Sequence, residues 1–204
     1  MFSIKPRTAT QIPEPPIART LFADTRMAWV WLVVRLYVGY EWLSAGWEKL
    51  TGPQRWVFSG HDGAAIKGFV SGALAQTTGS HPAVQGWYAA FLKDFVLPNA
   101  GLFAYLITFG EVLVGVGLFI GMLTGIAAFF GVFMNLNYLL AGTVSVNPVL
   151  GFLGIFLVLA WRVAGYYGVD RYLLPLLGTP WTGSLVRKSD EREPAAPTRL
   201  TATA

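Results

Sequence analysis

The chain lacks cysteine altogether and is poor in charged residues. Without cysteine it cannot form a disulfide, ligate a metal through thiolates or carry out dithiol redox chemistry by itself. Charged residues make up 13% of its 204 residues, whereas soluble domains usually carry about 25%. Hydrophobic residues make up 54%. This composition favours a membrane protein.

Several common functional signals are also missing from the sequence. It has no Gly-rich phosphate loop, no catalytic triad pattern and no secretory signal. His61 and His81 do not have the paired spacing of a metal site, so neither a metal nor a haem is predicted. The net charge of +4 comes from basic residues clustered at the two chain ends. That distribution suggests orientation in a membrane rather than binding of nucleic acid.

Long apolar segments predict an all-α fold, a four-helix transmembrane bundle. The four helices are expected at residues 27–50, 98–121, 124–142 and 147–167. Very short, uncharged connections join the last three helices, which should therefore be antiparallel neighbours. The membrane domain is expected to span residues 27–175, between a mostly extended tail at 1–26 and a disordered tail at 176–204.

The segment 52–97, between the first two long helices, is less apolar than the rest. It predicts an amphipathic helical hairpin with helices at about 63–76 and 82–96. The second of these carries Trp87, Tyr88, Phe91 and Phe95, as expected for a helix at the lipid–water boundary. Basic residues are concentrated in both tails, so both termini should be cytoplasmic and the hairpin extracytoplasmic. The expected location is the plasma membrane, with several spans.

Two charged residues of opposite sign lie inside the apolar segments. Glu111 is alone in the segment 102–121, and Arg35 lies within the segment 27–40. Measured from the cytoplasmic helix ends, Arg35 is roughly 12 Å deep, Glu111 about 15 Å and Asn135 about 16 Å. Charged side chains of opposite sign inside a membrane usually form pairs. We therefore predict an Arg35–Glu111 pair, braced by Asn135, which either only fixes helix register or takes part in ligand or proton chemistry.

Two rows of polar or small residues extend this polar interior. Glu41, Ser44 and Glu48 share one face of the first helix, and Glu41 is the deepest of them. Asn135 and Tyr138 lie on a stripe of the third helix that also contains Gly131 and Gly142, which is typical of a packing seam. Glycines at 117, 121 and 125 predict a second seam. The candidates for ligand binding or proton relay are Arg35, Glu41, Glu111, Asn135 and Tyr138.

The order and spacing of several of these residues resemble the motifs of a known family. The first helix of DoxX-type membrane proteins is similar to Arg35 followed by Gly39, Gly46, Lys49 and Leu50, and their second helix is similar to the segment that begins with Gly110–Glu111. The ending Gly168-Val169-Asp170 also resembles that family. The long outer segment and the run beginning at Asn135 are more similar to the DoxD branch, a subunit of thiosulfate:quinone oxidoreductase. The resemblance implies a quinone-linked membrane subunit, and thiosulfate chemistry would need another polypeptide because no DoxA-like domain is attached.

Three hypotheses for the function follow. The first is a membrane subunit of a redox complex that binds a quinone as its cofactor, with Glu111, Arg35 and Glu41 as headgroup or proton contacts. The second is a non-catalytic structural or assembly subunit, whose aromatic hairpin and glycine seams bind partner helices. The third is a carrier of a small molecule or ion. The expected partners are the lipid bilayer and other membrane or peripheral redox subunits. Whether the chain is itself an enzyme stays open.

Overall fold

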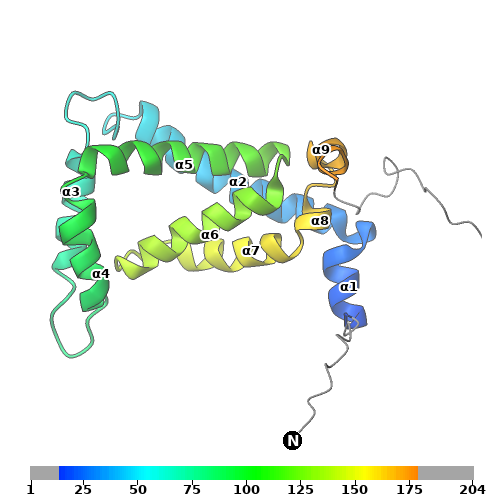
Figure 1. Cartoon of the computed structure of the whole chain (residues 1–204), viewed down its shortest axis with the longest axis horizontal. Coiled ribbons are helices and arrows are strands. Elements are labelled where there is room, and N and C mark those ends of the chain that lie inside the picture. Colours follow the sequence, from blue (N-terminus) through cyan, green and yellow to red (C-terminus); the bar gives the residue numbers. More distant parts are fainter. Residues whose placement is uncertain (1–13, 179–204) are drawn as a thin grey trace, which may run out of the picture.

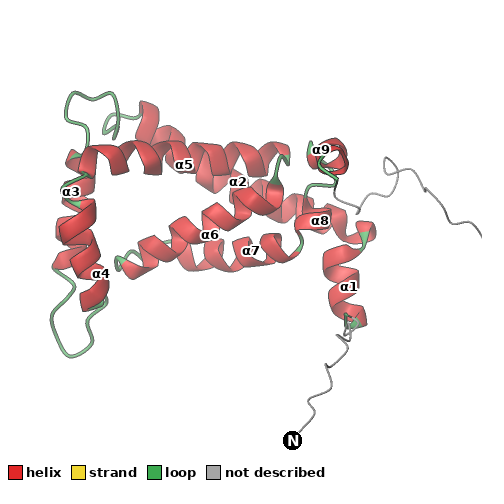
Figure 2. Ribbon diagram, viewed as in Figure 1, coloured by secondary structure: helices red, strands yellow, loops and turns green. Residues whose placement is uncertain are grey.

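The computed structural model describes residues 14–178, and this part of the chain is helical with no strand (Figures 1 and 2). The all-α prediction is therefore confirmed. The elements are α1 (Pro16–Ala23), η1 (Thr25–Met27), α2 (Ala28–Thr51), α3 (Ala64–Leu74), α4 (Gly86–Phe91), η2 (Leu92–Val96), α5 (Ala100–Ile120), α6 (Thr124–Leu140), α7 (Asn147–Leu159), α8 (Trp161–Ala164) and α9 (Asp170–Leu176). The long helices α2, α5, α6 and α7 lie within or close to the predicted ranges.

Two predictions about helix ends were wrong. The segment 1–26 was predicted to be mostly extended, but its described part is mostly helical. α1 begins with a proline at its first position and packs its Phe22 ring against Trp31 and Phe156, at centroid distances of 5.7 and 6.1 Å. The helix predicted at 147–167 breaks at Ala160 into α7 and α8. The remaining parts of both predicted tails, at 1–13 and from 179 onward, lie outside the described residues.

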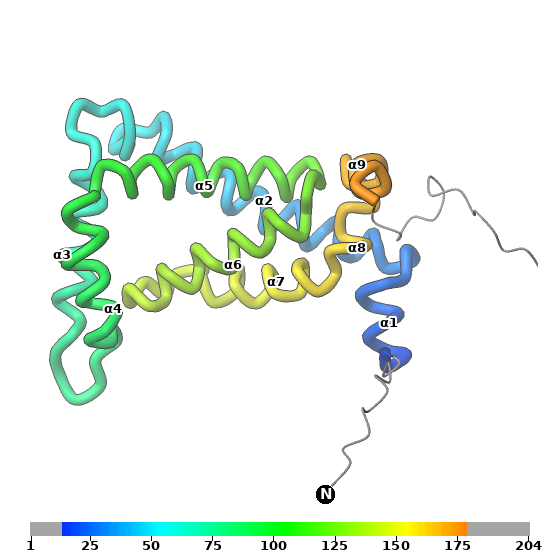
Figure 3. Tube along the Cα trace, viewed as in Figure 1, coloured from blue at the N-terminus to red at the C-terminus, as the bar shows by residue number. Residues whose placement is uncertain are grey.

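The long helices form two antiparallel pairs that meet at an acute angle. α2 packs along α5, and α6 packs along α7. α5 and α6 are joined by a tight turn and diverge from it, as the tube in Figure 3 shows. α3 and α4 lie across the wide end of this wedge, whereas α1, α8 and α9 lie at the narrow end (Figure 1). The outer hairpin predicted at 52–97 is therefore at the opposite end of the bundle from α1 and α9.

Glycines set the close approach of α2 to α5. A Cβ atom added at Gly115 would lie 2.6 Å from the Leu43 Cα atom, and one at Gly46 would lie 2.7 Å from the Val112 backbone nitrogen. Backbone atoms cannot move aside as the end of a flexible side chain can. The two helices therefore approach more closely than any larger residue at these positions would permit.

Replacing Gly115 with alanine is expected to lower the free energy of unfolding by about 1–3 kcal/mol, because the added methyl group forces α2 and α5 apart. Gly72→Ala in α3 is the matched control, since a Cβ there meets nothing within 4 Å. The control should be neutral or stabilise by about 0.5–1 kcal/mol, because alanine restricts the unfolded chain more than glycine does. Unfolding in detergent measures both, and equal effects would contradict the close-packing interpretation.

The surface of the bundle is apolar and its interior holds polar groups. Large apolar side chains point outward along every long helix, among them Leu113, Ile126, Phe133 and Phe152. Arg35, Thr108, Glu111, Asn135 and Asp170 are buried. A soluble protein rarely exposes so large an apolar surface, whereas a protein in lipid does so throughout.

Helix length and composition support one of the four predicted spans as a candidate. Among the described residues, α5 alone is both long and apolar enough to cross a bilayer, with a mean hydropathy of 2.0. α6 and α7 are apolar but shorter.

Candidate functional site

Glu111 lies at the centre of a buried polar cluster formed by three helices. Its side chain is 2% exposed, and the Lys49 ammonium from the end of α2 lies 2.8 Å from its Oε2 atom. This contact is an ion pair. On the other side, the Tyr138 hydroxyl of α6 donates to Glu111 Oε1 at 2.7 Å. The carboxylate is thus compensated by a cation and a hydroxyl donor.

Lys49 is held in place by its surroundings. Its Nζ atom lies 5.0 Å from the centre of the Trp56 ring and donates to the Ala45 carbonyl oxygen at 3.4 Å. Its side chain keeps 19% exposure, so the pair with Glu111 is near the wide end of the bundle. From the sequence Lys49 was expected to lie near the interface. Its position three residues after the buried Gly46, on the same helix face, was the available signal for a contact with α5.

The predicted Arg35–Glu111 pair was wrong. Arg35 Nη1 donates to the carbonyl oxygens of Leu118 at 2.5 Å and Phe119 at 3.0 Å, and Nη2 donates to the Tyr167 carbonyl oxygen at 3.1 Å. Leu118 is seven residues beyond Glu111 on α5, which is about 10 Å along the helix. The depth comparison assumed that all helices begin at one level. In the structure α2 begins beyond the level at which α5 ends, so Arg35 lies beside Leu118 and not beside Glu111.

Arg35 instead belongs to a second cluster, which we call the turn clasp: Arg35, Asp170 and the α5–α6 turn. Asp170 accepts hydrogen bonds from the backbone nitrogens of Leu123 at 2.6 Å and Thr124 at 2.8 Å. Its carboxylate thereby satisfies free N–H groups at the start of α6 and attracts the Arg35 guanidinium. The turn needs such support, since Leu123 has a left-handed backbone with φ of 50°.

The other predicted site residues are not brought into either cluster by a direct contact. Asn135 is buried, but within the described residues neither its Oδ1 nor its Nδ2 atom has a hydrogen-bond partner. It faces α7 near Gly151, where an added Cβ would lie 3.9 Å from its Nδ2 atom. Glu41 is half-buried, and its side chain makes no hydrogen bond or ion pair with the part of the chain that the structure describes.

The predicted glycine seam is used within the chain. Cβ atoms added at Gly117 and Gly125 would meet Ala127 and Trp161, and one at Gly121 would lie 2.5 Å from Arg35 Nη1. These glycines pack helices of the same chain, so they do not offer a free surface to a partner helix.

A groove of about 640 Å³ lies in the wedge between α5 and α6, and α3, α4 and η2 line its wide end. Its walls are almost wholly apolar, with Phe103, Leu106, Leu113, Ile126, Phe130 and Met134 among the lining residues. Its volume falls within the roughly 300–1,000 Å³ typical of small-molecule sites. Tyr138 lines the groove and also bonds to Glu111, so it connects the groove to the buried ion pair.

Two further polar residues, Tyr88 and Asn137, line the groove, and neither was among the candidates for ligand binding or proton relay. The Tyr88 hydroxyl of α4 donates to the backbone oxygen and to Oδ1 of Asn137, both at 3.0 Å. Burial raises the pKa of Tyr88 to about 12, so this hydroxyl keeps its proton at any physiological pH. Asn137 Nδ2 in turn donates to the Phe133 carbonyl oxygen at 2.8 Å. Tyr88 thereby ties the outer helices to α6.

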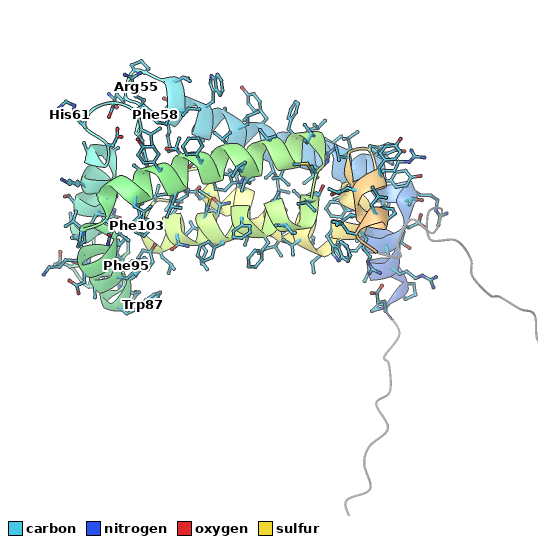
Figure 4. All side chains as sticks on the ribbon, turned by 45° about the horizontal axis from the view of Figure 1, so that its top comes forward. Arg55, Phe58, His61, Trp87, Phe95 and Phe103 are labelled. Carbon is cyan, nitrogen blue, oxygen red and sulfur yellow. The ribbon has the colours of Figure 1, made fainter. Side chains whose placement is uncertain are left out.

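The outer loop before α3 is anchored to α5 by Asp62. This carboxylate accepts from the Tyr105 hydroxyl at 2.6 Å and from the Ser59 backbone nitrogen at 2.9 Å. These donors hold the pKa of Asp62 below its usual value. In Figure 4, Phe58 and His61 lie on this loop, whereas Phe95, Phe103 and Trp87 lie along the end formed by the outer helices.

Within residues 14–178, no group of three His, Cys, Asp or Glu side chains comes together as a metal site.

An apolar exterior, a buried polar interior and an apolar groove beside an ion pair define a class of helical membrane protein. The DoxX family model matches residues 30–143, more than half of the chain, and the chain therefore belongs to the DoxX family. The match covers α2, α5 and α6, which carry Lys49, Glu111 and Tyr138. Membership makes this a membrane-associated protein of a family often linked to redox processes. No curated protein and no solved structure gave a match.

Proposed function

We propose that this DoxX protein is a membrane-embedded subunit of a quinone-linked redox complex and that the α5–α6 groove binds the quinone. The observation that carries the proposal is a polar junction in a largely apolar groove, where Tyr138 joins the lining to the Glu111–Lys49 pair. An apolar ring and tail match the walls, and a polar head matches the junction. Arg35 belongs to the turn clasp in this proposal and makes no headgroup contact.

The proposal includes a multi-pass arrangement with both termini in the cytoplasm. Trp29 and Trp47 are exposed near the two ends of α2 and are 18 residues apart, which corresponds to about 27 Å. Exposed tryptophans at this spacing match the two interfaces of a bilayer core of about 30 Å. The position of α1 and α9 at one end of the bundle and α3 and α4 at the other supports an even number of spans (Figure 1).

The resemblance of the outer segment and of the run beginning at Asn135 to the DoxD branch supports thiosulfate oxidation as the associated reaction, with quinone as the electron acceptor. The chain has no cysteine to carry a sulfur adduct. The sulfur chemistry would therefore belong to a partner polypeptide, and this chain would supply the quinone site.

Binding of a short-chain quinone to the full chain in lipid nanodiscs tests the proposed site. Leu113→Trp places a larger side chain in the groove and is expected to weaken binding at least about tenfold. Leu136→Trp is the matched control, since Leu136 is similarly exposed on α6 but does not line the groove. The control should bind as the wild type does. Equal affinities of all three proteins, or no binding by the wild type, would contradict the proposal.

A second candidate is a non-catalytic structural or assembly subunit. The observation that favours it is the exposure of Trp87 and Phe95 on the outer helices, since exposed aromatic residues are typical anchors of protein interfaces. A wild-type protein that binds no quinone but copurifies with a stoichiometric partner would support this function instead.

A further inference from the structure

The polar groups along the groove differ in what they can offer a ligand. Lys49 Nζ lies 2.8 Å from Glu111 Oε2, and as the carboxylate of this ion pair Glu111 can only accept hydrogen bonds. The hydrogen bond of 2.7 Å between Tyr138 and Glu111 must therefore use the tyrosine proton. The single O–H donor of Tyr138 is thus occupied, and only the lone pairs of its oxygen remain for a ligand.

The second polar pair has the same character. Tyr88 donates its only hydroxyl proton to Asn137, and one N–H of the Asn137 amide donates to the Phe133 carbonyl oxygen. What remains is the Tyr88 oxygen, part of the Asn137 Oδ1 atom and a single amide N–H. Among the described residues that line the groove, free acceptor positions therefore outnumber free side-chain donors.

We propose that the groove selects amphiphiles whose head carries a hydroxyl donor, such as a phenol or a hydroquinone, over the same molecule without that donor, such as an ether or a quinone. The inference rests on the proposed ligand site and adds its preference for one chemical state. A ligand hydroxyl donates to the Tyr138 oxygen and continues a chain from ligand to Tyr138 to Glu111. A ligand carbonyl or ether oxygen at this position faces lone pairs and loses the hydrogen bond that it made with water at the membrane surface.

The preference is testable with a redox-inert pair of probes, para-decylphenol and para-decylanisole, which share the ring and the chain. The full chain in nanodiscs is expected to bind the phenol on the order of tenfold more tightly or better, the usual effect of leaving a buried polar group unpaired. Tyr138→Phe should bind both probes equally. Tyr105→Phe is the control, because the Tyr105 hydroxyl bonds to Asp62 outside the groove, and this variant should keep the wild-type preference.

The outcomes separate the inference from the proposed function on which it depends. Equal wild-type binding of both probes overturns the hydroxyl preference and leaves the groove as a ligand site. An unchanged preference in Tyr138→Phe overturns the role of Tyr138. Binding of neither probe by the wild type overturns both the preference and the groove as a ligand site. Decylbenzene that binds as tightly as the phenol would show that ligands only fill the apolar groove, and this would also count against the preference. The wild-type comparison decides the matter if Tyr138→Phe does not fold.

The natural redox pair provides an independent readout. A decyl-substituted hydroquinone kept under anaerobic conditions should bind more tightly than its quinone to the wild type and equally to Tyr138→Phe. Tighter binding of the quinone would contradict the preference.

Discussion

Replacing Arg35 with methionine is expected to lower the free energy of unfolding by about 3–5 kcal/mol, the usual effect of breaking a buried charge network. The variant leaves the Leu118 and Tyr167 carbonyl oxygens without their donor and leaves Asp170 without its neighbouring cation. The loss should appear in chemical unfolding in detergent and as reduced yield of folded protein in membranes.

Arg26→Met is the control for the loss of an arginine from the same end of the chain. Arg26 pairs with Asp24 on the surface and is 83% exposed, so this variant should unfold almost as the wild type does. The double variant Arg35→Met/Asp170→Leu should lose less than the sum of the two single variants, because the partners are coupled. A wild-type unfolding curve for Arg35→Met would show that the turn clasp does not stabilise the bundle.

Glu111→Leu and Lys49→Met are each expected to destabilise the protein by about 3 kcal/mol, because each leaves a partner charge unpaired in a low-dielectric interior. The double variant should be milder than the sum by about 1–3 kcal/mol. Glu111→Leu should lower stability further by leaving the Tyr138 hydroxyl without its acceptor.

The same measurement distinguishes the two buried clusters. Glu111→Leu combined with Arg35→Met should be additive to within about 0.5 kcal/mol, since the sites are separated and share no partner. Coupling between Glu111 and Arg35 in place of Lys49 would contradict the assignment of these residues to separate clusters.

Hydropathy was sufficient to predict where the long helices lie, because a long uncharged segment has few alternatives to a helix in lipid. It was not sufficient to predict which buried charges meet. That depends on the relative heights of α2 and α5, which glycines at positions such as 46 and 115 determine through close packing. Arg35 and Glu111 therefore appeared to lie at the same depth when they do not. The buried positions of Glu111 and Asn135 were still predicted.

The groove could not be predicted from the sequence for a related reason. It exists because α5 and α6 diverge from a turn held by Asp170, a residue more than 40 positions further along the chain. Tyr138 was identified as a candidate only because it shares a helix face with Asn135. Its contact with Glu111 depends on the angle between α5 and α6, and no local sequence pattern encodes that angle.

The two ends of the wedge between α5 and α6 are held by different kinds of contact. The narrow end is joined by the chain itself and clasped by Asp170, whereas α3, α4 and η2 cover the wide end through side-chain packing and the Tyr88–Asn137 contact. We therefore expect ligands of different size to be accommodated by movement of α3, α4 and η2. A bulkier tail or a protein docked on α4 would change the width of the groove by displacing these helices, while the spacing between Glu111 and Lys49 on the α2–α5 pair stayed constant.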